Sequence, residues 1–446
     1  MKAGKLQKLL FIGLTLNTIL ACNFFEGISP SLPTSKVLPL QSPPPPAITA
    51  SPAGEIPSET AGGPGTQTPV APTPIQGPAI QRLTSNQRID ITYIHMIDAN
   101  QGWGIGGPAQ AQDHVFRTWN GGVNWSDVTP PQPAPAARET ESALGFFADA
   151  SDGWVVYSPT DTTAGPSQVP VWSTHDGGAS WSYGLIDTTD IPREYFMPWY
   201  LDFSDNQHGW MLVLLGGGMN HAYVALYSTI DGGGTWRDIL DPSMENGIQS
   251  FEKTGLVFTN AQVGWLTRDA QGVDSTPHAF LTQDGGTSWN RIDLPAPTGT
   301  SRWFDENSCG TYFPSLSSAS SMLLIMKCLD NATYKEEHDY LYSTKDTGQT
   351  WQSAPMPSAF KIPDPPAGGL FFMDAMNGLA LSRWIYRTDD GGKNWSTAKL
   401  VNWDGQFSFV DIDTGWAVAR NEGEMALVKT GDGGNSWEVI KPTVGP

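Results

Sequence analysis

Residues 229–236 read Thr-Ile-Asp-Gly-Gly-Gly-Thr-Trp, and this octapeptide pattern occurs seven times along the chain of 446 residues. Every copy has Thr at its first position, Gly at its fifth and Trp at its eighth. A short acidic or amide side chain accepts hydrogen bonds from nearby backbone N–H groups, and Gly adopts positive φ, so the pattern suits a tight turn. Apolar residues such as 224–227 precede it, and we therefore predict a hairpin turn, called the box turn below.

The third and eighth positions of the box turns are predicted to be structural. The Asp or Asn caps its own turn, and the indole ring is buried against neighbouring strands. We therefore assign none of these residues to catalysis. The third positions are Asn120, Asp176, Asp231, Asp284, Asp346, Asp390 and Asp432, and the eighth positions are Trp125, Trp181, Trp236, Trp289, Trp351, Trp395 and Trp437.

The spacing of the box turns predicts the fold. Successive box tryptophans lie 42 to 62 residues apart, which suits four short strands and their loops, the size of one propeller blade. The expected fold class is all-β, a seven-bladed β-propeller of four-stranded antiparallel blades over residues 82–446.

A Gly-Trp pair precedes most box turns, after a short apolar strand and a polar turn. It occurs at 102–103, 153–154, 209–210, 264–265 and 415–416, with Gly378-Leu379 as a variant and no counterpart in the fifth blade. Antiparallel strands place this turn and the box turn on one face of the ring. The opposite face, called the loop face below, is expected to carry the longest loops, at 130–145, 191–200, 295–312 and 355–368.

The N-terminus is predicted to direct export. Basic residues precede an apolar run that ends in Ile19-Leu20-Ala21-Cys22, which resembles a bacterial lipobox. We expect a signal peptide over 1–21, lipid attachment at Cys22, and a position outside the cytoplasm, on the periplasmic or cell-surface side of a membrane. Residues 22–81 are rich in Pro, Ser, Thr and Gly and are expected to form a disordered linker.

Cysteine use and charge narrow the remaining possibilities. Outside the cytoplasm, Cys309 and Cys328 are expected to form a disulfide, in the blade without a Gly-Trp pair. The formal net charge is −20, which argues against nucleic-acid binding because that requires a positive field. We expect no cofactor, no metal and a monomer.

The pattern Thr-x-Asp-Gly-Gly-x-Ser/Thr-Trp resembles the Asp box, or BNR repeat, of sialidases and other propellers. Together with the Gly-Trp strands and seven copies, residues 88–440 resemble the photosystem II assembly and stability factor family. The resemblance implies a non-enzymatic binding protein that assists the assembly of membrane proteins. The partner-binding face of that family is basic and this chain is acidic, so we do not carry over the photosynthetic role.

A glycoside hydrolase is the alternative function. Arg88-Ile89-Asp90 is the nearest match to the Arg-Ile-Pro stretch of sialidases and departs at its third position. A glycanase of the xyloglucanase type needs two carboxylates about 5–10 Å apart. Candidates on the predicted loop face are Glu139, Glu141, Glu194, Asp269, Asp305 and Glu306.

The predicted function is a binding or assembly scaffold that engages a protein or a glycan at the loop face. Aromatic and arginine side chains in non-repeat loops are typical of binding hot spots. The alternative, that these rings fill gaps between blades, stays open. The candidate binding residues are Arg193, Tyr195, Trp199, Tyr200, Arg302, Trp303, Phe304 and Trp403.

Overall fold

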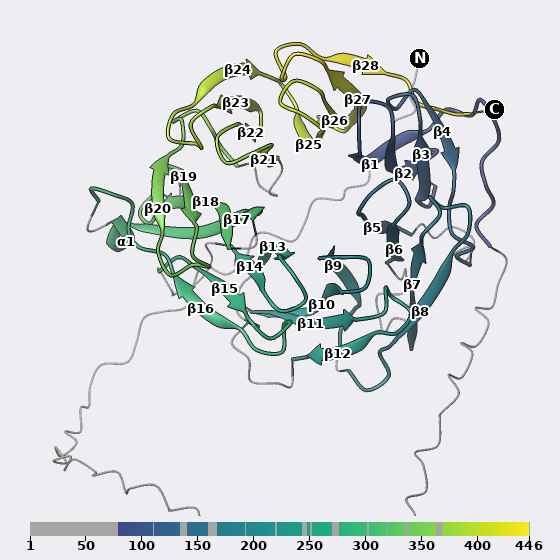
Figure 1. Ribbon diagram of the computed structural model, residues 1–446, viewed down its shortest axis with the longest axis horizontal. Coiled ribbons are helices and arrows are strands. Elements are labelled where there is room, and N and C mark those ends of the chain that lie inside the picture. The colour runs from purple at the N-terminus through teal and green to yellow at the C-terminus, as the bar shows by residue number, and fades with distance from the viewer. Residues whose placement is uncertain are drawn as a thin grey trace, which may run out of the picture. The chain divides into compact units, whose positions relative to one another are not determined.

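Seven antiparallel sheets of four consecutive strands form a ring, which confirms the predicted seven-bladed propeller (Figure 1). In each blade the first strand lies toward the centre of the ring and the fourth lies at the rim (Figure 1). The computed structural model describes residues 79–445 except 110, 134–140, 159–166, 192, 219–220, 243–247, 250–251, 270–275, 301–302, 319, 334, 336–337 and 363–367. The predicted signal peptide, Cys22, nearly all of the linker, Glu139 and Arg302 therefore lie outside the described residues. Within these described ranges, no helix is long and apolar enough to cross a membrane.

The first four blades follow the chain in order. Blade 1 holds β1 (Asp90–Met96), β2 (Gly102–Gly107), β3 (His114–Thr118) and β4 (Asn124–Asp127). Blade 2 holds β5 (Ala143–Phe147), β6 (Gly153–Tyr157), β7 (Gln168–Thr174) and β8 (Ser182–Asp187). Blade 3 holds β9 (Met197–Phe203), β10 (Gly209–Gly218), β11 (His221–Thr229) and β12 (Arg237–Leu240). Blade 4 holds β13 (Lys253–Phe258), β14 (Gly264–Arg268), β15 (His278–Thr282) and β16 (Asn290–Asp293).

The other three blades repeat this plan. A short helix, α1 (Trp303–Glu306), precedes blade 5, which holds β17 (Asn307–Ser318), β18 (Ser321–Asp330), β19 (Tyr340–Thr344) and β20 (Gln352–Pro355). Blade 6 holds β21 (Gly369–Phe372), β22 (Gly378–Leu381), β23 (Trp384–Thr388) and β24 (Ser396–Leu400). Blade 7 holds β25 (Asp404–Phe409), β26 (Gly415–Asn421), β27 (Glu424–Thr430) and β28 (Glu438–Ile440).

Both ends of the described chain close the ring at blade 1. The last strand, β29 (Thr443–Val444), pairs in parallel with β4 as a fifth, outermost strand of that blade. On the N-terminal side, the Leu83 N–H donates to Asp127 Oδ2 (2.8 Å). Ile80 is buried and its N–H donates to the Gln132 carbonyl (2.8 Å), so the propeller includes residues just before 82, where we expected it to begin.

The box turn of blade 3 shows why its pattern recurs. Asp231 Oδ1 accepts the Thr235 N–H and the Thr229 hydroxyl, both at 2.8 Å, and Asp231 Oδ2 accepts the Thr235 hydroxyl. The Thr229 Oγ1 atom in turn accepts the N–H of Gly233, which has a φ of 92°. The first and third positions thus bind the turn's own polar atoms. In blade 6, hydrogen bonds from Asn394 lower the pKa of Asp390 to about 2 by stabilising its ionised form.

The Gly of each Gly-Trp pair makes room for an apolar side chain six residues earlier, at the end of the first strand. A Cβ atom on Gly209 would lie 2.2 Å from the ring of Phe203. The same clash arises at Gly153 with Phe147, at Gly264 with Phe258 and at Gly415 with Phe409. This six-residue spacing is readable in the sequence, although our sequence analysis did not use it.

In blades that have a Gly-Trp pair, its Trp contacts the next blade. Trp154 of blade 2 stacks on Phe203 of blade 3 with a centroid distance of 3.8 Å. Its Nε1–H donates to the carbonyl of Gly232, the fourth residue of the blade 3 box turn (2.8 Å). The same hydrogen bond joins Trp210 to Gly285 (2.8 Å) and Trp416 to Gly121 (2.9 Å), the latter across the ring closure.

Three predicted loops are wrong in part, because strands occupy one end of each. Residues 143–145 belong to β5, 197–200 to β9 and 307–312 to β17. Trp199 and Tyr200 therefore lie on the innermost strand of blade 3, and Trp303 and Phe304 lie on α1. These strands contain polar and aromatic residues, and they pack against side chains of neighbouring blades. Hydrophobic alternation along one segment does not reveal such packing, so the strand ends were not predicted.

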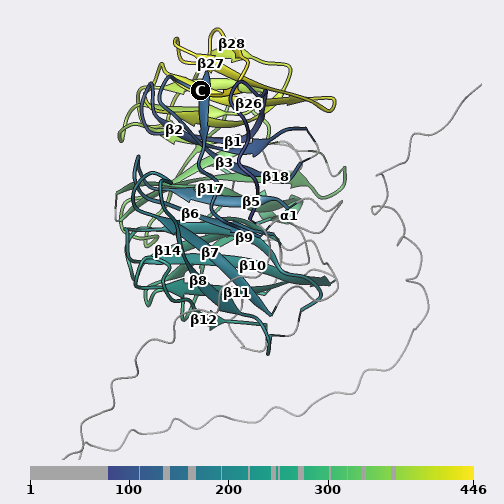
Figure 2. The same cartoon turned by 90° about the vertical axis from the view of Figure 1, so that its right-hand side faces the viewer.

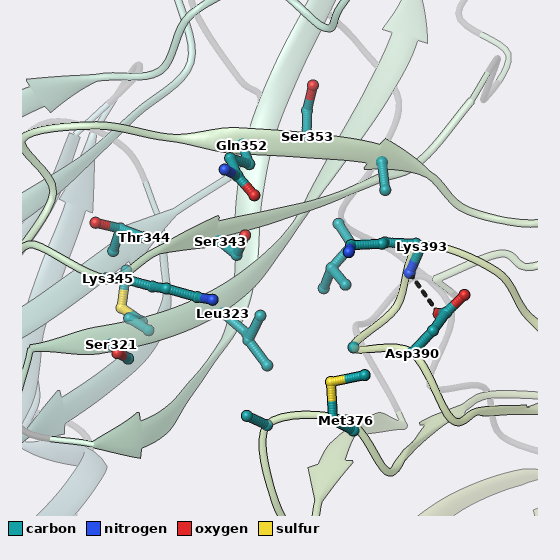
Figure 3. A pocket seen from close by; sticks show the side chains of 15 residues that line it. Ser321, Leu323, Ser343, Thr344, Lys345, Gln352, Ser353, Met376, Asp390 and Lys393 are labelled. Carbon is teal, nitrogen blue, oxygen red and sulfur yellow. Dashed lines mark hydrogen bonds between the residues drawn. The ribbon is translucent and has the colours of Figure 1, made fainter.

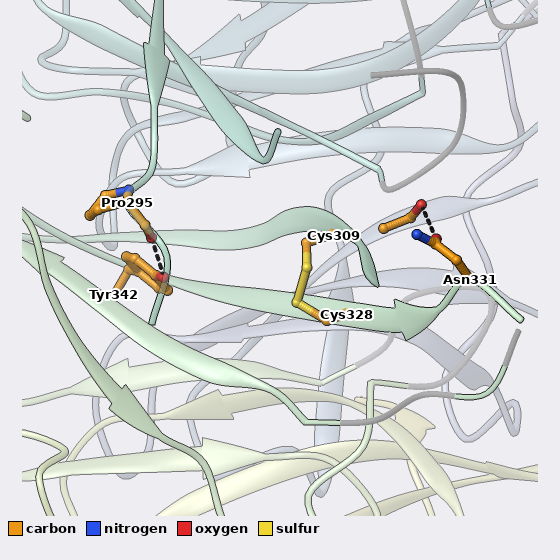
Figure 4. Close-up of a disulfide and its surroundings, with 6 residues drawn as sticks. Pro295, Cys309, Cys328, Asn331 and Tyr342 are labelled. Carbon is orange, nitrogen blue, oxygen red and sulfur yellow. Dashed lines mark hydrogen bonds between the residues drawn. A yellow bond between two sulfur atoms is a disulfide. The ribbon is translucent and has the colours of Figure 1, made fainter. Parts of the chain in front are cut away.

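In blade 5, the disulfide lies between the first two strands. Cys309 of β17 faces Cys328 of β18, and their sulfur atoms are joined (Figure 4). The bond lies inside a cluster of buried residues that includes Trp265 and Tyr342. The Tyr342 hydroxyl donates to the Pro295 carbonyl (2.7 Å), which fixes the connection from blade 4 (Figure 4).

We predict that Gly209→Ala lowers the free energy of unfolding by about 1–3 kcal/mol, the usual cost of overpacking. The Phe203 ring cannot move aside, because it is held between the new Cβ atom and Trp154. Urea denaturation followed by circular dichroism measures the change. Gly431→Ala is the matched control, since a Cβ atom there meets no heavy atom within 4 Å. Equal stability of the two variants would contradict this role of Gly209.

Candidate functional site

The loop face is where strand-two-to-strand-three hairpins and blade connections meet. Figure 2 shows α1 and the far ends of β10 and β11 projecting on the same side of the ring. The first strand of each blade begins at this face, because its far end leads into the Gly-Trp turn. Side chains at the starts of β9 and β13 therefore belong to the loop face.

Three of the predicted binding aromatics lie together at blade 3. Tyr195, Trp199 and Tyr200 are partly buried against the hydrophobic cluster shared by blades 3 and 4. The rings of Trp199 and Tyr200 have centroids 6.5 Å apart, and the Tyr200 hydroxyl donates to the Lys253 carbonyl (3.2 Å). These three rings, with Glu194, Glu252 and Lys253, are called the blade 3–4 patch below. Each ring packs on the core and is only partly buried, and a binding role for these rings stays a prediction.

Buried basic residues line the loop end of blade 4, and sequence analysis missed them. Lys253, Arg268 and His278 are 4%, 0% and 2% exposed. Burial and the neighbouring Arg268 lower the pKa of Lys253 to about 7, while Glu252 opposes this shift. The three residues stand at the start of strand one, the end of strand two and the start of strand three. In the sequence, a basic residue at each of these three strand ends could have indicated that they meet at one place.

Acidic groups surround the phenol of Tyr195. Its pKa is raised by burial and by the nearby carboxylates Glu194 and Glu252. Both effects disfavour the phenolate that a tyrosine nucleophile must form. The Arg193 guanidinium donates to the carbonyls of Thr188 and Ile191 in its own loop.

The structure does not bring the other predicted binding residues to this patch. Phe304 packs against the blade 4–5 cluster. Trp403 packs edge-on against the box tryptophan Trp437 of its own blade, with a centroid distance of 5.4 Å. Asp404, the next residue after Trp403, forms an ion pair with Arg383 (2.6 Å). The site predicted as one set is therefore divided among blades 3, 5 and 7.

Of the remaining predicted carboxylates, the structure describes the side chains of Asp269, Glu306 and Glu141, which lie at blades 4, 5 and 2. Asp269 accepts a hydrogen bond from the Tyr312 hydroxyl between blades 4 and 5. Glu306 is exposed at the end of α1, and Glu141 is half-buried near blade 2. Among the described residues, no group of three or more His, Cys, Asp or Glu side chains is placed to hold a metal ion.

Similar solved structures share only 13–16% of their residues with this chain. No family model matches the sequence, and no curated protein resembles it significantly. The structure is similar to YCF48 from Cyanidioschyzon merolae, at 15% identity and a TM-score of 0.47, over 79% of this chain and 98% of that one. It is also similar to YCF48 bound to D1 peptide, at 16% identity and a TM-score of 0.46, over 82% and 99% of the two chains. The GH74 enzyme of Niastella koreensis shares 13% identity with a TM-score of 0.32, over 80% and 62% of the two chains.

A buried acid joins blades 3 and 4 beneath the patch. Asp202 Oδ2 accepts the Phe258 N–H (2.6 Å), and burial raises the pKa of Asp202 to about 7. The folded state therefore holds a proton that the unfolded chain releases near pH 4. This contribution to stability is complete below about pH 4 and is lost as the pH rises through about 7.

We predict that Asp202→Asn removes this pH dependence, because the amide oxygen still accepts the Phe258 N–H and carries no charge. The loss of unfolding free energy between pH 5 and pH 8 should be about 1–3 kcal/mol smaller in the variant than in the unmodified protein. Urea titrations at the two pH values measure both slopes, and other titrating groups cancel in the comparison. Parallel pH profiles for the two proteins would show that Asp202 ionises normally.

Proposed function

We propose that this chain is a non-catalytic binding or assembly scaffold that engages a protein segment through the blade 3–4 patch. The observation that supports this function is the grouping of Tyr195, Trp199 and Tyr200 at the first strand of blade 3, against the hydrophobic cluster shared with blade 4. Rigid, half-buried aromatics next to charged groups are the usual anchors of protein interfaces. A scaffold of this kind is also what the resemblance to propeller assembly factors implies.

The charges around the patch favour a partner with both donors and acidic groups. Glu194 and Glu252 are exposed and accept hydrogen bonds from peptide N–H or cationic groups. Buried Lys253, Arg268 and His278 add hydrogen-bond donors just below the surface in a chain of net charge −20. A segment that presents both kinds of group to the patch would be held in one orientation.

A glycoside hydrolase remains the second candidate, because Glu194 and Glu252 both lie close enough to Tyr195 to raise its pKa. Two carboxylates around one ring-lined site are the minimum that sugar hydrolysis requires. The raised pKa of Tyr195 and the backbone contacts of Arg193 make the sialidase form of this chemistry a poor fit.

We expect Trp199→Ala to weaken capture of the partner from native membranes about tenfold, the effect of losing one anchor ring. Photo-cross-linking from position 199 identifies the partner, and quantitative mass spectrometry compares the captured amounts. Trp119→Ala is the control, because Trp119 is 54% exposed on the box turn of blade 1, at the opposite face. Unchanged capture by Trp199→Ala would contradict the patch. The glycoside hydrolase hypothesis would be favoured if the unmodified protein hydrolyses a glycan and Glu194→Gln or Glu252→Gln abolishes that activity.

The location of the scaffold is part of the proposal, namely outside the cytoplasm and anchored by lipid on Cys22. We predict that Cys22→Ser moves the protein from the membrane to the soluble fraction and removes the acyl mass from its N-terminal peptide. Two or more acyl chains are needed for a lasting anchor. Ser29→Ala, seven residues further on, should stay with the membrane. An unmodified Cys22 thiol in exported protein would contradict the anchor.

A further inference from the structure

A cleft opens between blades 5 and 6 on the face that carries the box turns, away from the blade 3–4 patch. Its volume is about 160 Å³, and residues from β18, β19 and the blade 6 box turn line it (Figure 3). The residues that carry the argument are Leu323, Lys345, Met376, Gly391 and Lys393. We call it the blade 5–6 cleft.

Leu323 occupies the position of the inter-blade tryptophan. In blade 3, Trp210 pairs with Ser228, one residue before the box Thr. In blade 5, Leu323 pairs with Ser343 in the same register. A leucine side chain is smaller than an indole and has no N–H group.

Leucine cannot donate a hydrogen bond to the Gly391 carbonyl, as three of the tryptophans do to the equivalent glycines. Trp103 of blade 1 donates instead to the Asp149 carbonyl. Gly391 is the fourth residue of its box turn, equivalent to Gly121, Gly232 and Gly285, which each accept a tryptophan Nε1–H. Within the described residues, no donor reaches the Gly391 carbonyl. The corresponding groove between blades 3 and 4 has Trp210 in its lining, and that indole is bonded to Gly285.

The cleft also carries features that suit an aromatic ring next to negative charge. Met376 lines it and is 50% exposed, and thioether sulfur atoms make favourable contacts with aromatic rings. Lys345 and Lys393 are exposed and reach toward the cleft from opposite sides (Figure 3). Facing lysines repel one another unless an anion or a ring face lies between them. A cavity of roughly 150 Å³ holds a benzene ring, so the cleft has room for the six-membered part of an indole.

We propose that the blade 5–6 cleft binds a tryptophan side chain supplied by an acidic peptide segment, which completes the blade contact that Leu323 leaves unmade. The indole N–H donates to the Gly391 carbonyl, and its ring lies against Leu323 and Met376. Carboxylates that flank the tryptophan pair with Lys345 and Lys393. This second docking surface is independent of the proposed function of the loop face.

Fluorescence anisotropy with the labelled peptide Asp-Glu-Trp-Glu-Asp and the full chain tests the proposal. Replacing the peptide's Trp with Leu should weaken binding at least tenfold. Replacing it with 1-methyltryptophan, which lacks the indole N–H, should weaken binding about fivefold or more. A Lys-Lys-Trp-Lys-Lys peptide should not bind measurably. Equal binding of the Trp and Leu peptides, or of the acidic and basic peptides, would overturn the proposal.

Variants locate the site. Leu323→Trp places an indole in the cleft from within the chain, so peptide affinity should fall at least tenfold while the melting temperature rises. Lys345→Ala and Lys393→Ala should each weaken binding of the acidic peptide about threefold to tenfold. These two variants still test the site if Leu323→Trp does not fold. Thr287→Ala, at the equivalent position of the blade 4 box turn, is the control and should leave affinity unchanged. The site would be refuted if none of the cleft variants alters peptide affinity. Trp199→Ala, at the loop face, should leave peptide affinity unchanged.

Discussion

The contact between one blade's tryptophan and the next blade's box turn is the interaction on which the ring depends. Each of the three best-defined contacts combines a buried indole with a hydrogen bond of 2.8–2.9 Å to a glycine carbonyl. The hydrogen bond adds a directional contact between blades, and the indole ring adds a large buried apolar area. The Trp416–Gly121 contact crosses from the last blade to the first, so it helps to hold the closure that β29 completes.

Where the repeat is intact, this contact commits the box-turn face of the molecule to structure. The box aspartates use both carboxylate oxygens within their own turns, as Asp231 does, and the paired glycines must accommodate phenylalanine rings. Function is therefore left to positions where the repeat does not constrain the side chain. At the loop face these positions are the first residues of the inner strands, where blades 3 and 4 bring aromatic and charged groups together.

Departures from the repeat are informative because the other blades show what is missing. Leu323 stands where an indole joins other blades, and a cleft with two lysines lies beside it. The same blade contains the Cys309–Cys328 disulfide, which ties its first two strands together. Leu379 also replaces the tryptophan in blade 6, but its side chain is fully buried, so a leucine alone does not open a cleft.

The amino-acid sequence by itself determined the number of blades, the antiparallel order of strands and the face on which the box turns lie. These follow from local chemistry, since Thr, Asp and Gly at set positions dictate one turn and that turn repeats. Only the tertiary structure decided which distant residues meet. Tyr200 and Lys253 lie in different blades and approach each other because the ring brings two inner strands together. Trp403, by contrast, packs against Trp437 of its own blade, although both it and Trp199 were predicted to bind a partner. Burial of Lys253, Arg268 and His278 depends likewise on side chains contributed by neighbouring strands, and spacing along one chain does not encode such packing.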